Sequence, residues 1–266
     1  MWMRYFIFTV IISSWNINSV RIRTDHIKNY LKKEKIDILF LQEIKCQTDQ
    51  FPEEFFKNLG YNCYVNGQKS YNGVAIISKK KLDKIDIKNF KDPNNQSRFI
   101  STNVLINNKS TQLICIYLPN GNPVDTEKYS YKLEWLKNFI KYIEKLYKKN
   151  KNIIIGGDFN VIPEEIDVKN PEDWVDDALY TLEIRKEFRR ILNIGFKDAF
   201  RLFSNESEQF TFWDYQQGSW NRNKGLRIDH FLVSQKLVED IKNIKIDKYV
   251  RGKIKPSDHA PIQITF

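Results

Sequence analysis

The chain has few cysteines and no long apolar run. Its three cysteines, Cys46, Cys63 and Cys115, are scattered and lack the paired spacing of a structural zinc site. An odd, scattered set is also unsuited to a disulfide framework, so we expect reduced thiols in a cytosolic protein. The apolar stretch Tyr5–Ile12 is too short to cross a bilayer and has no clear small-residue cleavage site. We interpret Phe6–Trp15 as the first buried strand, with a signal peptide as the alternative, and expect no membrane association.

Internal repeats, low-complexity tracts and long linkers rich in proline, glycine or serine are also absent. Such segments mark domain boundaries and repeat architectures, so their absence predicts one domain over residues 1–266. A chain of this length can bury one sizeable core. A content of 41% hydrophobic and 14% aromatic residues is typical of a packed globular protein.

The formal net charge is +10, from 43 Lys and Arg against 33 Asp and Glu. A basic surface attracts polyanions and speeds their encounter, and nucleic acid is the usual partner. Compositional bias is the alternative, because lysine, asparagine and isoleucine are abundant throughout. The charge therefore supports binding to nucleic acid without establishing it.

Short apolar runs, typical of strands in length and β-branched content, recur along the chain. After the first strand they lie at Ile36–Leu41, Val74–Ser78, Phe99–Ile106, Gln112–Leu118, Asn152–Ile155, Ile228–Val233 and Pro261–Phe266. Strands outnumber the predicted helices, and several are consecutive. This favours an α/β (α+β) fold in which sheets pack on each other with helices outside, rather than a simple alternating arrangement.

Two helices are predicted between these runs. The first is capped by Thr24 and ends at Glu34. Its apolar face holds Ile27, Tyr30 and Leu31. The second begins near Asp125, with apolar residues at spacings of three and four: Tyr129, Leu133, Leu136, Ile140, Ile143 and Tyr147. Its opposite face is rich in lysine, which is typical of a solvated face.

Polar side chains follow several predicted strands directly. Asn16 and Asn18 follow the first strand, Glu43 follows Leu39–Leu41, and Asp158 and Asn160 follow Ile153–Ile155. Strand ends and the loops beyond them are where α/β scaffolds place chemistry. We therefore expect these side chains to share one site.

Phosphodiester hydrolysis needs hard oxygen ligands for a divalent metal, a group that positions or deprotonates water, and cations that balance charge on the phosphate. Together with Asp229 and Asp258, the strand-end residues supply oxygens of this kind. His259 can bind or protonate a phosphate oxygen, and a carboxylate partner would raise its pKa for that task. The set predicts a metal-dependent phosphodiesterase.

Each segment has a structural alternative when taken alone. Gly156-Gly157 would let the chain turn sharply and bring Asp158 to the sheet edge, which a plain strand-to-loop turn would also explain. The Asp258-His259 pair is also consistent with a surface feature, and Glu43 with an exposed loop.

In their order along the chain, these segments resemble the successive motifs of the exonuclease III family of abasic-site endonucleases, bacterial type, within the endonuclease/exonuclease/phosphatase superfamily. They are Trp15–Arg21, Leu41–Lys45, Tyr117–Gly121, Gly157–Asn160, Leu226–His230 and Ser257–Pro261. The resemblance runs from Ser14 to Pro261, essentially the whole chain.

The resemblance implies a four-layer αββα sandwich of two mixed sheets flanked by helices. It also implies cleavage on the 5′ side of an abasic nucleotide in base excision repair, with one or two Mg²⁺ ions and Mn²⁺ as a substitute. Relatives commonly add 3′-phosphatase, 3′-phosphodiesterase and 3′→5′ exonuclease activity. The implied partner is duplex DNA with abasic sites or blocked 3′ ends, bound by a cytoplasmic monomer.

Roles follow from the same resemblance. Glu43 matches the principal metal ligand, and Asp158 matches the group that orients or deprotonates water. His259 matches the phosphate-binding histidine, oriented by Asp229, and Tyr117 the tyrosine beside the scissile phosphate. The implied metal set is Asn16, Asn18, Glu43, Asp158, Asn160, Asp258 and His259, and the implied catalytic set is Tyr117, Asp158, Asn160, Asp229 and His259. Which of these oxygens bind metal and which activate water depends on whether one or two metal ions are bound.

Residues outside the catalytic set would choose the substrate. Arg21, Tyr71, Arg98, Asn120 and Asn170 match positions that contact DNA in relatives. Phe212, Trp213, Leu226 and Ile228 match a pocket for an abasic sugar, which rotates out of the helix at low cost. Ordinary core packing is the alternative for the aromatic residues, and surface cations for the arginines. Gln216 and Gln217 stand where animal members carry an apolar wedge, so wedging of the DNA stack is not expected there.

Two other functions are compatible with parts of the pattern. A phosphatase of the same superfamily, acting on small phosphorylated molecules, would not need the aromatic segment or the basic charge. A non-catalytic DNA-binding module would predict the loss of Glu43, Asp158, Asp229 or His259, and all are present.

Overall fold

The computed structural model describes residues 9–266, which form two mixed sheets. The first sheet has the order β11 (Asn243–Ile246), β12 (Ile262–Thr265), β1 (Ile11–Asn16), β2 (Ile38–Gln42), β4 (Val74–Ser78) and β3 (Asn62–Asn66). The second has the order β5 (Asp83–Asp86), β6 (Phe99–Ile106), β7 (Lys109–Tyr117), β8 (Ile153–Asp158), β10 (Asp229–Ser234) and β9 (Phe196–Asp198).

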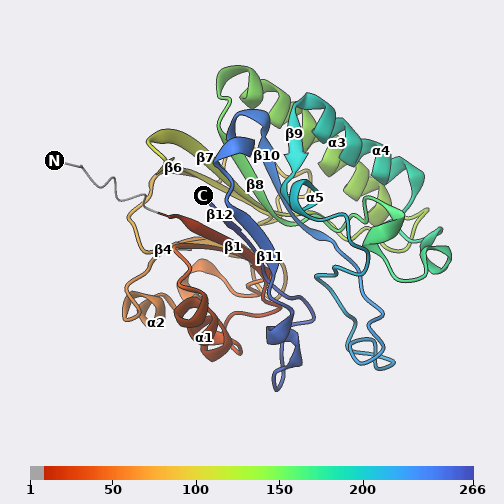
Figure 1. Ribbon diagram of the computed structural model, residues 1–266, viewed down its shortest axis with the longest axis horizontal. Coiled ribbons are helices and arrows are strands. Elements are labelled where there is room, and N and C mark those ends of the chain that lie inside the picture. Colours follow the sequence, from red (N-terminus) through yellow and green to blue (C-terminus); the bar gives the residue numbers. More distant parts are fainter. Residues whose placement is uncertain (1–8) are drawn as a thin grey trace.

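Helices cover the outer faces of both sheets (Figure 1). The first sheet packs against α1 (Thr24–Glu34) and α2 (Glu53–Lys57), and the second against α3 (Glu127–Lys149) and α4 (Leu182–Ile194). A short helix, α5 (Ala199–Phe203), contributes to the core between the sheets. This arrangement confirms the predicted αββα sandwich.

Alternate residues along each strand build different layers of the core. In β2, Phe40 packs between the sheets, while Leu39 and Leu41 pack on the helical side. In β8, Ile154 packs between the sheets and Ile155 toward α3 and α4. Successive side chains of a strand point to opposite faces, and both faces are covered here. This explains why the strands are continuous apolar runs in the sequence.

Parallel strand pairs bring the polar strand ends to one edge of the sandwich. β1 is parallel to β2 with Asn16 opposite Gln42, and β7 is parallel to β8 with Tyr117 opposite Asp158. β10 is antiparallel to β8, so its first residue, Asp229, lies opposite Asp158. The fold therefore gathers residues from five strands and loops that are far apart in the sequence.

Most predicted elements are present, with shifted ends. The predicted strands correspond to β2, β4, β6, β7, β8, β10 and β12, and β4 and β6 have the predicted bounds. The first strand begins at Ile11; residues 6–8 of the predicted Phe6–Trp15 lie outside the described part. Four strands, β3, β5, β9 and β11, were not predicted. Within residues 9–266, no helix has both the length and the apolar character needed to span a bilayer.

Two local predictions are wrong. Thr24 is the first residue of α1 rather than its cap, because Arg23 holds the cap position and no side chain caps the helix. Gly156 and Gly157 lie inside β8 rather than in a turn. A Cβ on Gly157, whose φ is +154°, would lie 2.0 Å from the carbonyl oxygen of Ile116 in the neighbouring strand. The glycine therefore allows close strand pairing up to Asp158.

Candidate active site

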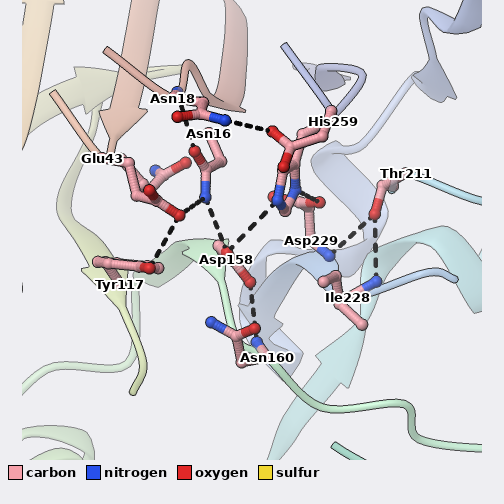
Figure 2. Close-up of polar contacts among 12 residues, drawn as sticks. Asn16, Asn18, Glu43, Tyr117, Asp158, Asn160, Thr211, Ile228, Asp229 and His259 are labelled. Carbon is pink, nitrogen blue, oxygen red and sulfur yellow. Dashed lines mark hydrogen bonds and ion pairs between the residues drawn. The ribbon is translucent and has the colours of Figure 1, made fainter. Parts of the chain in front are cut away.

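Asn16 joins the two sheets at the centre of the candidate site (Figure 2). It is fully buried at the end of β1, and its Nδ2 donates to Glu43 Oε1 at 2.9 Å and to Asp158 Oδ2 at 3.0 Å. Its Oδ1 accepts from the backbone N–H of Asn18 at 3.1 Å. One amide therefore fixes two carboxylates, one from each sheet.

Several site residues adopt left-handed backbone conformations. The φ angles are +45° at Asn18, +49° at Glu43, +52° at Lys45 and +46° at Asn160. Asparagine tolerates this region, but glutamate and lysine adopt it at a cost that the surroundings must offset. The chain thus turns directly after β2, with Glu43 facing the site.

Glu43 is surrounded by donors. Tyr117 donates to its Oε1 at 2.8 Å, and the Lys45 ammonium lies 2.8 Å from its Oε2. Burial opposes ionisation of Glu43, but the Lys45 charge and the hydrogen bonds from Asn16, Lys45 and Tyr117 outweigh it and hold the pKa of Glu43 below its usual value. Glu43 is therefore a carboxylate in the neutral range.

Tyr117 is held in place by Arg98. The guanidinium of Arg98 stacks 4.6 Å from the centroid of the Tyr117 ring and donates to the Tyr117 carbonyl at 3.2 Å. Burial and then the Glu43 charge raise the pKa of Tyr117 well above its usual value, so its hydroxyl keeps its proton. Arg98, predicted to contact DNA, is largely buried and packs against the tyrosine.

His259 lies between two carboxylates. Its Nδ1 is 2.8 Å from Asp229 Oδ2, and its Nε2 is 3.8 Å from Asp158 Oδ2. Burial opposes the charged imidazolium, but the charge and hydrogen bond of Asp229, followed by the charge of Asp158, raise the pKa of His259 to about 10. The histidine is therefore a cation at neutral pH, with its Nε2–H directed toward Asp158.

Asp158 is fixed through both of its oxygens. The backbone N–H of Asn160 donates to Oδ1 at 2.9 Å, and Asn16 donates to Oδ2. Burial raises the pKa of Asp158 to about 7, against the opposing charge of His259. A carboxylate poised near neutrality and aimed into a polar site is suited to accept a proton.

The donor set fits a divalent cation. Asn18 Oδ1 and Glu43 Oε2 both contact the Lys45 ammonium, at 2.6 and 2.8 Å, which marks a position where a cation is stabilised. Asp258 lies beside it, since its Oδ1 accepts from Asn18 Nδ2 at 3.0 Å. Asp158, Asp229 and His259 also place one ligand atom each within 4.8 Å of one another. His259 is itself a cation, so the group that contains it would repel a metal ion. The oxygens around Glu43 therefore fit a metal ion better.

A small cavity lies beside Phe212, a residue that also contacts the histidine. It has a volume of about 160 Å³, and Trp174, Phe212 and Leu226 form its apolar walls. The Phe212 ring packs edge-on against the His259 imidazole at 4.9 Å between centroids. Of the residues predicted for a sugar pocket, Phe212 and Leu226 line this cavity.

The other two predicted pocket residues do not line the cavity. Trp213 is fully buried against Trp220 in the core on the outer side of the first sheet, and its Nε1 donates to Asn223 at 3.2 Å. Ile228 is buried in the small apolar cluster beneath Leu226. Successive residues of an extended segment face opposite sides, so Phe212 and Trp213 cannot both face the cavity.

The predicted DNA contacts lie around the site with different exposures. Arg21, Tyr71, Asn120 and Asn170 are exposed. Arg21 donates to the backbone of Lys45 at 3.5 Å, and Asn120 Nδ2 lies 3.3 Å from Asn160 Oδ1. These four side chains are exposed to solvent, whereas Arg98 is buried.

A buried charge network behind the site was not predicted. Arg227 contacts Asp167 through Nε at 2.6 Å, Asp198 at 2.8 Å and His230 Nδ1 at 3.0 Å. It ties the segment 164–170, through the buried Asp167, to β10, which carries Asp229. The sequence did contain a signal for this network, since Arg227 and Asp167 each lie between apolar residues. Charged side chains are rarely fully buried unless they are paired, so a pair between them could have been expected.

Residues 13–259 match the family model described as Endonuclease/Exonuclease/phosphatase family. The chain belongs to this family. It is 34% identical over 263 residues to exodeoxyribonuclease III of Haemophilus influenzae, covering 95% of this chain and 98% of that protein. It is 33% identical over 258 residues to an exodeoxyribonuclease of Bacillus subtilis, covering 94% and 97%.

Solved structures agree with this placement in the endonuclease/exonuclease/phosphatase family. A 3′ phosphatase, NExo, from Neisseria bound to product DNA hairpin superposes with a TM-score of 0.89 at 32% identity, over 96% of this chain and 98% of that one. An AP endonuclease from Archaeoglobus fulgidus gives a TM-score of 0.89 at 33% identity, with the same coverage. The predicted relationship to exonuclease III and the abasic-site endonucleases is confirmed.

Proposed function

We propose that this chain is a Mg²⁺-dependent DNA repair nuclease that hydrolyses the phosphodiester 5′ to abasic sites in duplex DNA. The same site would remove 3′ phosphates and 3′ nucleotides. The observation that carries the proposal is the pair formed by Asp158 and His259, which lie 3.8 Å apart with a proton acceptor on one side and a cation on the other. A phosphate bound beside this pair would meet both groups that hydrolysis requires.

In this mechanism Asp158 accepts a proton from the attacking water. The water oxygen forms a bond to phosphorus while the bond to the upstream 3′ oxygen breaks. The water proton passes to Asp158, and the 3′ oxygen takes up a proton from solvent and leaves as a hydroxyl. Asn16 and Asn160 keep the carboxylate oriented, because each donates to a different oxygen.

His259 and Tyr117 act on the phosphate. The imidazolium of His259 donates from Nε2 to a non-bridging oxygen, while Asp229 holds Nδ1 and keeps the ring charged. Tyr117, whose hydroxyl keeps its proton, can donate beside Glu43. Both groups are held before substrate arrives, so little reorganisation accompanies the reaction.

Glu43, Asn18 and Asp258 would hold the metal ion, since Mg²⁺ prefers hard oxygen ligands and Mn²⁺ accepts the same set. When bound, the ion supplies positive charge that stabilises the phosphate in the transition state. Lys45 would then give up its contacts with Glu43 and Asn18, whose oxygens the ion requires.

The cavity formed by Phe212, Leu226 and Trp174 supports an abasic substrate. Its volume of about 160 Å³ is well below the roughly 300 Å³ at which pockets for drug-sized ligands begin. A bare deoxyribose is small enough for a cavity of this volume, whereas a nucleoside, which also carries a base, is too large for it. The net charge of +10 and the DNA hairpin bound by the Neisseria relative support a DNA partner for the same site.

We also propose that the chain acts as a monomer, as one catalytic domain, on cytoplasmic DNA.

The test of the proposed nuclease activity is an assay with Mg²⁺ on three substrates: a duplex with one tetrahydrofuran abasic analogue, the same duplex intact, and a small phosphate monoester. Nicking confined to the 5′ side of the analogue supports the proposal. Turnover of the small ester without nicking would instead identify a phosphatase of the same superfamily.

A further inference from the structure

Lys132 is a buried lysine on a helix whose other lysines face solvent. It lies in the second turn of α3 and is fully buried. Its Nζ donates to three backbone carbonyls, of Asn120 at 2.9 Å, Asn160 at 2.6 Å and Ala178 at 2.8 Å. Lys132 lies beside the apolar face of the helix, while the lysines of the opposite face are exposed as expected.

The three acceptors match the three N–H bonds of an ammonium group. The aliphatic stem is equally constrained, because Gly121 packs directly on it. A Cβ on Gly121, whose φ is +87°, would lie 2.5 Å from Lys132 Cδ. Both the amino end and the stem of this lysine are thus built into the loops that follow β7 and β8.

Each of the three carbonyls belongs to a segment that serves the site. Asn160 donates its N–H to Asp158 Oδ1 at 2.9 Å and its Nδ2 to the Leu118 carbonyl at 2.9 Å. Asn120 contacts Asn160 through its side chain. Ala178 follows Asp177, whose N–H donates to the carbonyl of the cavity residue Trp174 at 2.9 Å.

We propose that Lys132 is a positioning residue for phosphodiester hydrolysis, holding Asn160 and therefore Asp158 in the reactive geometry. This inference rests on the proposed function of Asp158. In this proposal Lys132 contacts neither substrate nor metal. It acts through Asn160, a residue in the left-handed backbone conformation whose N–H orients the Asp158 carboxylate. Without the ammonium, three carbonyls lose this donor and the segments that carry Asn120, Asn160 and Ala178 can separate.

The test compares Lys132→Met and Lys132→Gln with wild type in the presence of Mg²⁺. The methionine fills the stem volume without donors, and the glutamine keeps two N–H donors. Single-turnover cleavage of a duplex with a 3′ phosphate and of a tetrahydrofuran duplex should slow about a hundredfold in Lys132→Met, since small misplacements of reacting groups have effects of this size. KM for DNA should change much less, and Lys132→Gln should recover part of kcat.

Two controls separate positioning from general destabilisation. Lys141→Met makes the same change on the exposed face of α3, and Ile143→Ala removes buried packing from the same helix. Both should retain wild-type kcat when assayed well below their melting temperatures. Equal kcat in Lys132→Met and wild type would overturn the proposal, and so would a kcat loss of the same size in Ile143→Ala.

Hydrogen exchange supplies a readout that does not depend on cleavage. Peptides covering residues 157–162 and 118–122 should exchange at least about tenfold faster in Lys132→Met than in Ile143→Ala, because they lose their shared anchor. Unchanged protection of these peptides would overturn the positioning role even if wild type cleaves neither DNA. Inactivity of wild type on both DNAs would instead contradict the proposed function.

Discussion

Nδ1 of His259 lies 2.8 Å from Oδ2 of Asp229, and both side chains are buried. The other oxygen of this carboxylate, Oδ1, is buried and has no hydrogen-bond partner among residues 9–266, while the backbone N–H of Asp229 is held by Thr211 Oγ1 at 3.1 Å. A buried carboxylate with this one side-chain partner keeps that partner charged. The pair is therefore the source of the positive charge that faces Asp158.

Asp229→Asn should lower kcat about 10²- to 10⁴-fold, the usual contribution of an oriented acid–base group. The asparagine keeps the shape but not the charge, so the pKa of His259 falls from about 10. Because the reactive form carries the proton, activity should be lost at a lower pH than in wild type as the pH rises. A pH–rate profile measures this. Asp240→Asn, at a distant surface ion pair with Lys109, is the control; an unshifted basic limb in Asp229→Asn would contradict the assignment.

Removal of divalent metal should lower the thermal stability of the protein, and Glu43 should be required for the effect. An ion that binds only the folded state stabilises it by mass action, by about 2.7 kcal/mol at a hundred times its dissociation constant. Melting curves with Mg²⁺ and with EDTA should therefore differ for wild type and coincide for Glu43→Gln. Glu53→Gln, at an exposed pair with Lys57, should keep the wild-type difference. An equal Mg²⁺ shift in Glu43→Gln would rule out this ligand.

Trp174→Ala should weaken discrimination against base-bearing nucleotides. The indole forms one wall of the cavity, so its removal enlarges the space next to Phe212. Changes in an apolar pocket alter selectivity by roughly 10- to 200-fold. We expect the ratio of tetrahydrofuran to intact-site nicking to fall within this range, measured under single-turnover conditions. The neighbouring exposed Val175 provides the control Val175→Ala, and an unchanged ratio in Trp174→Ala would exclude the cavity as the sugar site.

The strands were predictable from the sequence where burial on both faces makes them apolar. Val74–Ser78 and Phe99–Ile106 have the predicted bounds for this reason. Asp83–Asp86 and Asn243–Ile246 were missed, because edge strands face solvent and contain polar residues. Their strand conformation comes from pairing with a neighbour, which local sequence does not encode.

The gathering of the polar residues at one edge of the sandwich was predictable, because they follow strand ends in a recognisable order. Contacts between residues that are far apart in the sequence were not predictable. Nothing in the sequence marked Lys132 as a buried group, and only the folded loops supply its three acceptors. Trp174 lies on a short 3₁₀ turn after Pro171, and its place beside Phe212 depends on how that segment packs. Trp213 was wrongly predicted to line the sugar pocket with Phe212, because adjacent residues of an extended segment point to opposite sides.

Acid should destabilise the fold through His230. Burial, followed by the Arg227 charge, lowers the pKa of His230 to about 4, against about 6.5 in the unfolded chain. Between these values only the unfolded state binds the proton, so the contribution is complete above pH 6.5 and is lost as the pH falls toward 4. At about pH 5 the loss is roughly 2 kcal/mol.

Urea denaturation at about pH 7 and pH 5 would measure this contribution. His230→Asn should show a smaller difference in unfolding free energy between the two conditions than wild type. His26→Asn, on the outer helix α1, should behave like wild type. Parallel pH dependence in wild type and His230→Asn would show that His230 is not the group that titrates.

In the proposed mechanism, cleavage at an abasic site depends on Asp158. Single-turnover rates of nicking a tetrahydrofuran duplex with Mg²⁺, compared between wild type and Asp158→Asn, test this dependence. We expect a cut on the 5′ side of the analogue by wild type and a rate about 10²- to 10⁴-fold lower in Asp158→Asn, with DNA binding retained. Equal rates for the two proteins, or a wild type that leaves the analogue site uncut, would contradict the proposed mechanism.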